Sequence, residues 1–143
     1  MNPKELSFDQ EGRDKLLSGI TKISKAVKST LGPLGKTVLI ESPNHTGGIT
    51  ITKDGVTVAK SIDLEDPAEN LAISMMKEAA DRTATSAGDG TTTAIVLAEA
   101  IVKEGMQLIQ RNPEINTTQL IRDIKVISDN AIKELDLSSK KVY

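Results

Sequence analysis

The hydrophobic pattern of the chain predicts four long helices. The first spans about Asp9 to Leu31, and its apolar face is formed at three- and four-residue steps by Leu16, Leu17, Ile20, Ile23 and Val27. Asp9 is a suitable N-cap, with Phe8 before it as the residue of a hydrophobic staple. The helix is expected to end at Gly32-Pro33, because proline disfavours helical geometry in the residue before it.

The second helix carries a broad apolar stripe. It is expected to begin at Pro67, which suits a first helical turn, after an acidic entry that starts at Asp63. Its stripe consists of Ala68, Leu71, Ala72, Met75, Met76, Ala79, Ala80, Thr83 and Ala84. We assign Met75 and Met76 to the core. On the opposite face, the spacing predicts the ion pairs Lys77–Asp81 and Glu78–Arg82.

The third and fourth helices differ in how much of their surface is apolar. The third spans about 91–109, and Glu99 is the only charged residue within 94–102, so this helix is predicted to be buried on most faces. The fourth is capped by Asn116 or Thr117. Its apolar face is formed by Leu120, Ile121, Ile124, Ile127, Ala131, Ile132 and Leu135.

Two short runs between the first and second helices predict a β-hairpin. Residues 36–41 are rich in β-branched side chains, 42–48 carry turn residues, and 49–52 alternate with period two. Two strands alone are marginal in water, so the hairpin should pack on helices or pair with further strands, including those of another chain. The following residues 56–59 are predicted by propensity to form a strand.

Composition excludes several classes of function. The chain has 143 residues, a length typical of one domain, and its formal net charge is −2, without the basic excess of a nucleic-acid-binding protein. Its only aromatic residues are Phe8 and Tyr143, which disfavours base-stacking modules. The absence of cysteine excludes disulfides and thiolate metal sites and fits a reducing compartment. No secretory signal and no membrane-spanning stretch is evident, so a cytoplasmic protein without a membrane partner is expected.

The segment Gly88-Asp89-Gly90-Thr91-Thr92-Thr93 is the strongest candidate for chemistry. The two glycines allow a ligand to approach the backbone closely, and the helix that follows directs its N–H groups at the turn, where a phosphate can bind. The three threonines add hydroxyl donors, and Asp89 can hold Mg²⁺ together with phosphate oxygens. An ordinary turn followed by an ordinary helix cap explains the same residues without a ligand. The segment lacks the Walker A pattern.

Two further glycine-containing breaks are weaker signals by themselves. Residues 30–35 can be a simple helix stop, and Lys53-Asp54-Gly55 can be a hairpin turn. Lys53 could offer a positive charge to phosphate, and Asp54 could orient water or assist a metal ion. His45, in a loop without a second His or Cys, is expected to be solvated.

Taken in order, the three segments resemble the N-terminal half of the equatorial domain of group I chaperonins, the GroEL family. The resemblance spans essentially the whole chain and depends on four motifs in register: Val27 to Lys36, Ile51 to Ala59, Ile62 to Asn70 and Ala87 to Ala94. The sequence departs from the family at Leu34, where lysine is common, and around Thr46-Gly47-Gly48. The fold class implied is mainly α, a bundle of long helices with a small β-hairpin stem-loop.

This resemblance implies an ATP-dependent protein-folding function with ATP and Mg²⁺ as cofactors. Carried over residue by residue, the nucleotide pocket comprises Thr30, Leu31, Gly32, Pro33, Lys53, Gly88, Asp89, Gly90, Thr91, Thr92 and Thr93. Within it, Lys53 contacts phosphate, Asp89 coordinates Mg²⁺, and Asp54 lies beside the γ-phosphate and assists hydrolysis. The resemblance also implies that 56–59 begins a short helix and that the hairpin joins the strands of a neighbouring subunit in a homo-oligomeric ring.

Family chains are several times longer than this sequence. Residues 1–135 correspond to the N-terminal part of the equatorial ATP-binding domain and 136–143 to the start of the intermediate domain. The surfaces that bind unfolded proteins and the co-chaperonin, and a second catalytic carboxylate, belong to other parts of such chains, so we expect no appreciable ATP turnover by these 143 residues alone. The alternatives are a non-catalytic module that co-assembles with full-length chaperonin subunits, or a phosphate-binding protein of another kind.

Overall fold

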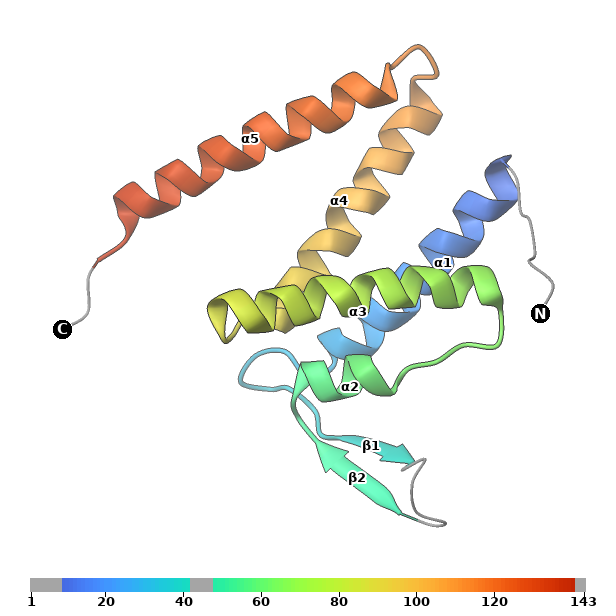
Figure 1. Ribbon diagram of the computed structural model, residues 1–143, viewed down its shortest axis with the longest axis vertical. Coiled ribbons are helices and arrows are strands. Elements are labelled where there is room, and N and C mark those ends of the chain that lie inside the picture. The colour runs from blue at the N-terminus through green and yellow to red at the C-terminus, as the bar shows by residue number, and fades with distance from the viewer. Residues whose placement is uncertain (1–8, 42–47, 141–143) are drawn as a thin grey trace. The chain divides into compact units, whose positions relative to one another are not determined.

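A computed structural model describes residues 9–41 and 48–140 (Figure 1). The chain forms two compact units that divide between Lys103 and Glu104. The elements in chain order are α1 (Asp9–Lys28), β1 (Val38–Glu41), β2 (Ile49–Thr52), α2 (Gly55–Ser61), α3 (Pro67–Ala87), α4 (Thr91–Arg111) and α5 (Thr117–Ser138). The predicted class, long helices with one small hairpin, is therefore confirmed. Phe8, His45 and the 42–47 part of the hairpin loop lie outside the described residues.

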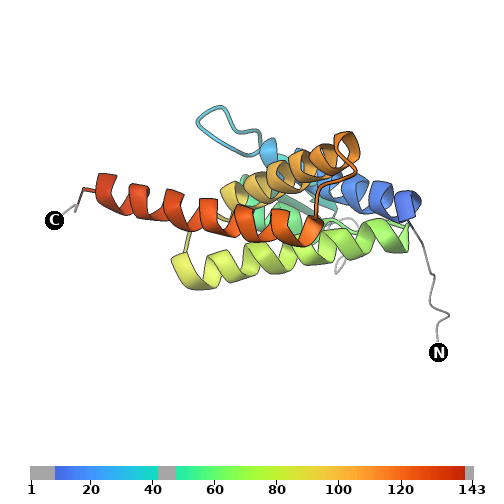
Figure 2. The ribbon, with the colours of Figure 1, turned by 90° about the horizontal axis from the view of Figure 1, so that it is seen from above.

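The core of the first unit is small and aliphatic. Helices α1, α2 and α3 lie side by side (Figures 1 and 2), and the first turns of α4 complete the cluster. Its buried members are Ile23, Val27, Val58, Ala59, Ile73, Met76, Ala80 and Ile95. Helices α1 and α3 approach closely at Gly19, where a Cβ atom would overlap the carbonyl oxygen of Glu69. The missing side chain of Gly19 thus lets the two helix backbones come together.

Local sequence sets both ends of α3. The Asp66 carboxylate accepts hydrogen bonds from the backbone N–H groups of Ala68 (2.9 Å) and Glu69 (3.1 Å), and Pro67 occupies the first turn. At the other end, Gly88 adopts a left-handed conformation (φ 76°) and donates its N–H to the carbonyl of Ala84 at 3.0 Å. The predicted start of this helix at Pro67 is confirmed.

The buried face of α3 is narrower than predicted and shifted. Ile73 has no exposed surface, whereas Leu71 and Met75 are 59% and 63% exposed. The assignment of Met75 to the core is therefore wrong, and that of Met76, 5% exposed, is confirmed. The apolar residues of α3 cover a wider arc than α1 and α2 can contact, so the contacts of the unit select which of them are buried.

The predicted burial of the third helix on most faces is also wrong. Leu97 and Ile101 on α4 are 56% and 52% exposed, while the single charged residue in this stretch, Glu99, is only 6% exposed. Buried positions on α4 are limited to Thr91, Ile95 and Glu99, which follow one another at intervals of four residues. This part of α4 therefore contacts the rest of the first unit through a single stripe, which has a polar residue at each end, Thr91 and Glu99.

Residues 56–59 form part of helix α2 and not the strand that propensity predicted; the family resemblance gave the correct expectation. Asp54 caps the helix by accepting from the N–H groups of Val56 (3.3 Å) and Thr57 (3.0 Å). Val58 and Ala59 are then buried in the common core, at 2% and 1% exposure. A good cap and tertiary burial outweigh the modest strand preference of β-branched side chains.

The hairpin is antiparallel, with Val38 opposite Thr52 and Glu41 opposite Ile49. Val38 and Ile40 are half-buried against the helical core. The opposite surface of the hairpin is apolar and open, since Leu39, Ile49 and Ile51 are each about two-thirds exposed (68%, 67% and 68%). The predicted packing of the hairpin on helices is confirmed for one face only.

The second unit comprises the end of α4, a turn and α5. Asn112 ends α4, and the side chain of Asn116 caps α5 by accepting from the N–H of Gln119 at 3.1 Å, as one of the two predicted caps. Helix α5 has no buried residue, and Ile121, Ile127, Ile132 and Leu135 on its predicted apolar face are 53–69% exposed. Within 9–41 and 48–140, no helix is long and apolar enough to cross a membrane.

Candidate nucleotide-binding site

The turn before α4 places a glycine at the N-cap of this helix. The carbonyl of Gly90 accepts from the N–H of Ala94 at 2.9 Å, so Gly90 occupies the N-cap position. Glycine has no side chain with which to cap, in contrast to Asp54, Asp66 and Asn116 at the starts of the other helices after the hairpin. The N-cap of α4 is therefore Gly90 and not an Asp or Thr side chain, and glycine is itself a common N-cap.

Asp89 stabilises the turn through one oxygen of its carboxylate, which stays exposed. Its Oδ1 accepts from the N–H of Gly90 at 2.6 Å, and its side chain is exposed. Gly90 has a φ of 84°, a conformation that residues with side chains rarely adopt. Thr91, which is buried, Thr92, which is half-buried, and Thr93, which is exposed, form the first turn of α4, where the helix dipole favours an anion.

The tertiary structure brings the second motif against the third. A Cβ atom at Gly55 would overlap the hydroxyl oxygen of Thr92 and would lie 3.2 Å from Cγ1 of Val27. The start of α2 therefore touches the start of α4, and the last turn of α1 lies against the same point. Lys53 and Asp54 immediately precede this contact, and both are exposed.

Asp54 is held in place by its capping bonds. In addition to the two backbone N–H groups of α2, the hydroxyl of Thr57 donates to Oδ2 at 2.6 Å. This hydroxyl has the largest effect on the pKa of Asp54; burial opposes it, the backbone bonds of Thr57 and Val56 add to it, and the net pKa is lowered. The side chain is therefore an ionised and oriented acceptor, well suited to orient a donor such as water and poorly suited to take up a proton.

The segment that follows α1 forms a closed loop. The N–H of Lys36 donates to the carbonyl of Ser29 at 2.7 Å, and that of Gly35 donates to Gly32 at 3.0 Å. The loop projects away from the helices (Figure 2), and Leu31 is 48% exposed. The loop follows directly on the turn of α1 that carries Val27. Among the described residues, no backbone hydrogen bond joins the loop to either of the other two motifs.

The donor set fits magnesium held jointly with phosphate. Among residues 9–41 and 48–140, no group of three or more His, Cys, Asp and Glu side chains could hold a metal ion. Asp89 alone is too few ligands for a metal site made of protein only. Mg²⁺ is commonly bound by one or two carboxylates together with substrate phosphates, which is the arrangement that Asp89 beside the first turn of α4 allows.

A buried polar cluster that the hydrophobic pattern did not predict joins α4 to α1. The Glu99 carboxylate on α4 accepts from the hydroxyl of Ser24 (2.7 Å) and from the ammonium group of Lys28, both on α1. Burial by itself raises the pKa of Glu99, but the hydrogen bonds from Lys28 and Ser24 and the charges of Lys28 and Lys103 outweigh it, so the net pKa is lowered. In the sequence, the only sign of this cluster was the single charged residue Glu99 in an apolar stretch of the helix. Its partners Ser24 and Lys28 could not be predicted, because they depend on how α1 and α4 cross.

A second cluster of the same composition joins α1 to α3. The Glu69 carboxylate accepts from the hydroxyl of Ser18 at 2.6 Å and from the ammonium group of Lys22 at 2.6 Å. The bond from Lys22 has the largest effect on the pKa of Glu69 and that from Ser18 the next; burial and the charge of Asp66 oppose them, and the pKa is lowered. Two of the helices that contact α1, namely α3 and α4, are therefore each joined to it by a buried or half-buried carboxylate.

Because the pKa values of Glu69 and Glu99 are lowered in the folded chain, we expect the fold to lose stability in acid. A carboxyl whose pKa is lower in the folded than in the unfolded chain stabilises the fold above the unfolded pKa, and the contribution disappears as the pH falls through the folded pKa. The unfolding free energy should therefore decrease as the pH falls through the ordinary glutamate pKa of 4.5 and onward through the lowered pKa values of the folded chain. The double variant Glu69→Gln/Glu99→Gln should show a flatter decrease in urea titrations, and an unchanged slope would contradict the assignment.

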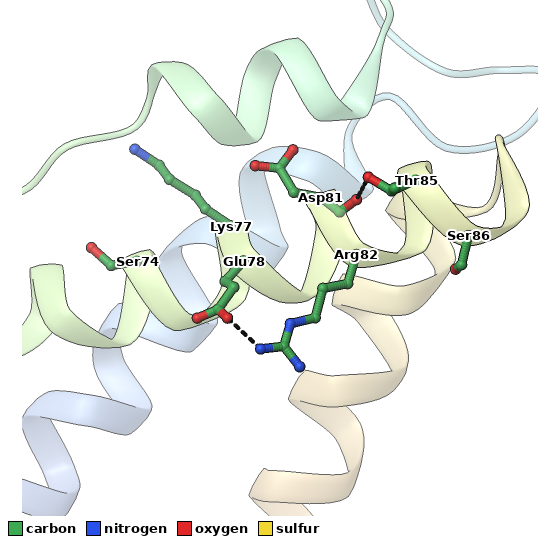
Figure 3. Close-up of a pocket in the computed structure, with 7 residues that line it drawn as sticks. All are labelled: Ser74, Lys77, Glu78, Asp81, Arg82, Thr85 and Ser86. Atoms are coloured by element: carbon green, nitrogen blue, oxygen red, sulfur yellow. Dashed lines mark hydrogen bonds and ion pairs between the residues drawn. The ribbon is translucent and has the colours of Figure 1, made fainter.

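One surface depression lies apart from the three motifs. It is lined by residues of α3 alone, which are Ser74, Lys77, Glu78, Asp81, Arg82, Thr85 and Ser86 (Figure 3). The predicted Glu78–Arg82 ion pair is present at 2.6 Å, whereas Lys77 pairs with Asp63 and Asp81 pairs with Lys60, so the predicted Lys77–Asp81 pair is wrong. The outer face of a single helix does not enclose a ligand.

Comparison with known proteins identifies the class of this chain. Residues 23–143 match the TCP-1/cpn60 chaperonin family, and the chain belongs to this family. In fold it is similar to the chaperonin gp146 from the bacteriophage EL 2 (Pseudomonas aeruginosa), whose crystal structure was determined in the presence of ATP-BeFx. The TM-score is 0.77 at 32% sequence identity, over 93% of this chain and 22% of the phage chaperonin. The chain therefore spans about a fifth of that relative, and the resemblance to chaperonin equatorial domains is confirmed.

Proposed function

We propose that this chain is the segment of an ATP-dependent, protein-folding chaperonin subunit that binds Mg–ATP and takes part in ring assembly. The observation that carries the proposal is the contact of Gly55 with Thr92, which joins the Lys53-Asp54-Gly55 motif to a helix start whose cap position is a glycine. Membership of the chaperonin family and a structural relative crystallised with an ATP analogue support a nucleotide as the ligand.

Each motif has a role in this proposal. The N–H groups and hydroxyls of Thr91, Thr92 and Thr93 bind phosphate oxygens, and Gly88 and Gly90 let these oxygens approach the backbone. The roles of Lys53 and Asp89 follow from their charges, and those of the loop residues follow from the resemblance to the chaperonin family. Lys53 adds a positive charge to the phosphates, Asp89 holds Mg²⁺ with them, and the loop residues Thr30, Leu31, Gly32 and Pro33 line the nucleotide pocket.

Asp54 is the only catalytic candidate among these residues. Because three donors already hold its carboxylate in the ionised form, we assign it the orientation of water beside the terminal phosphate. One carboxylate with a lowered pKa is a poor proton acceptor, so we expect the 143-residue chain to bind Mg–ATP without steady hydrolysis.

The hairpin supports a role in assembly. Leu39, Ile49 and Ile51 expose an apolar surface on a sheet of only two strands, and such a hairpin gains stability by pairing with further strands. We propose that these strands come from a neighbouring chaperonin subunit in a ring. Unfolded proteins and a co-chaperonin would contact other regions of the subunit, and a cysteine-free chain suits the cytoplasm.

Direct binding of Mg–ATP tests the nucleotide site. We expect isothermal titration calorimetry to show binding that requires Mg²⁺, and Asp89→Ala to weaken it about tenfold or more, which corresponds to the loss of about 1.4 kcal/mol. Asp129→Ala is the matched control, because Asp129 is an exposed carboxylate on α5. No binding by the unaltered chain, or equal binding by the Asp89 variant, would contradict the proposed site.

The alternative is a non-catalytic module that co-assembles with full-length chaperonin subunits. The exposed apolar surface of the hairpin favours assembly whether or not nucleotide binds. Size-exclusion chromatography of the chain mixed with a full-length chaperonin, with and without ATP, separates the two functions. Mixed rings together with no measurable nucleotide binding would favour the module.

A further inference from the structure

Helix α1 carries the same polar pair twice, and each pair faces a different helix. Ser18 and Lys22 are four residues apart, as are Ser24 and Lys28, so both members of each pair lie on one face of the helix. The second pair follows six residues after the first, which turns it by about 240° around the helix axis. The first pair binds Glu69 on α3, and the second binds Glu99 on α4.

The Glu99 cluster, defined as Ser24, Lys28 and Glu99, is the more deeply buried of the two. Ser24 has no exposed surface, and the side chain of Glu99 is 8% exposed, compared with 14% for Glu69 in the Glu69 cluster of Ser18, Lys22 and Glu69. A carboxylate in this environment requires its partners, because a buried charge without a counter-charge is strongly unfavourable. The cluster therefore fixes where α1 ends relative to α4.

The position of the cluster in the chain connects it to two of the three nucleotide motifs. Lys28 is the last residue of α1, and the carbonyl of the next residue, Ser29, closes the 30–35 loop by accepting from the N–H of Lys36. Glu99 lies on the same buried stripe of α4 as Thr91, two turns and about 12 Å along the helix. One ion pair thus joins the base of the loop to the helix whose first turn carries the threonines.

We propose that Ser24, Lys28 and Glu99 are positioning residues that hold the 30–35 loop in register with the phosphate-binding turn of α4. This inference depends on the function proposed for that site, and it adds residues that touch neither nucleotide nor metal. The Glu69 cluster has the same chemistry and joins α1 to a different helix, so it contributes to stability without setting this register. The two clusters form a matched pair for experiment.

The first test compares nucleotide affinity in Glu99→Gln, Ser24→Ala, Glu69→Gln and Ser18→Ala, at a temperature and pH where urea titrations show each to be folded. We expect the two changes in the Glu99 cluster to weaken Mg–ATP binding about fivefold or more, the low end of couplings between linked sites. The two changes in the Glu69 cluster should leave affinity within about twofold while lowering stability comparably. Equal effects of both clusters on affinity, or none from the Glu99 cluster, would overturn the proposal.

The second test needs no nucleotide and separates this inference from the proposed function. Hydrogen exchange of the Gly35 and Lys36 amides reports whether the loop remains closed, since Gly35 donates to Gly32 within the loop and Lys36 donates to Ser29 at its base. We expect Glu99→Gln to speed this exchange and Glu69→Gln to leave it unchanged. If the unaltered chain binds no Mg–ATP, the proposed function fails and this measurement still decides the positioning role; unchanged exchange in Glu99→Gln would reject that role even where nucleotide binds.

Discussion

Replacing Gly19 by alanine is expected to lower the free energy of unfolding by about 1–3 kcal/mol, the range for overpacked interiors. Alanine is the better helix former, and in an exposed helix interior the same change would add about 1 kcal/mol of stability. The sign reverses here because the new Cβ would overlap the backbone carbonyl of Glu69 and lie 3.0 Å from its Cα. Backbone atoms cannot rotate away as a side chain can, so α1 and α3 would have to separate.

Gly105→Ala provides the matched control for this prediction. Gly105 is also inside a helix, in the second unit, and no heavy atom lies within 4 Å of the position that its Cβ would occupy. We expect this variant to be more stable by about 0.5–1 kcal/mol. Urea titrations followed by far-UV circular dichroism measure both changes. A stabilising Gly19→Ala would show that the helices do not approach each other as closely as described.

Ile73→Ala is expected to have the largest effect of any single truncation on α3, a loss of about 2–5 kcal/mol. Ile73 has no exposed surface and lies in the core cluster with Ile23, Val58 and Ile95 from the other three helices of the unit. Truncation removes apolar contacts within this cluster and leaves a cavity that rigid helices fill only in part. Chemical denaturation of the intact chain measures the loss.

Leu71→Ala and Met75→Ala test the same helix at positions that the hydrophobic pattern assigned to the core. Their side chains are 59% and 63% exposed, so each truncation should change the free energy of unfolding by only about 0.5 kcal/mol. The relative losses of unfolding free energy in the three variants show which face of α3 is buried, the face that the hydrophobic pattern predicted or the face that the structure shows. A large effect of Met75→Ala with a small one of Ile73→Ala would mean that α3 packs through the face that the sequence predicted.

Local chemistry explains why the helices and the hairpin were predictable. Asp66 and Asn116 cap helices through side chains that lie within three residues of the N–H groups they bind, and Gly88 ends α3 in a conformation that glycine readily adopts. These interactions need no distant partner. Helix α2 was not predictable from propensity because its short run of β-branched residues suits a strand as well, and the burial of Val58 and Ala59 tips the balance.

In the candidate site, too, the local features were predictable from the sequence and the contacts between distant residues were not. Gly88-Asp89-Gly90 and the three threonines are contiguous, so their pattern alone predicted a phosphate-binding helix start. That Gly55 touches Thr92 is a contact between residues far apart in the chain, and no spacing rule predicts it. The family resemblance linked the two motifs in the sequence, and the packing of α2 against α4 is what places them together.

By itself, the sequence determined the four long helices, the hairpin, the chaperonin family and the turn before α4, because each depends on neighbours within a few residues or on contiguous motifs. Only the tertiary structure decided that Ile73 is buried and Met75 exposed, that Glu99 pairs with Ser24 and Lys28, and that Gly19 admits no side chain. These features depend on the angle and rotation at which helices cross. Many helix faces in this chain are apolar enough to pack, and the close approach of the backbones selects among them.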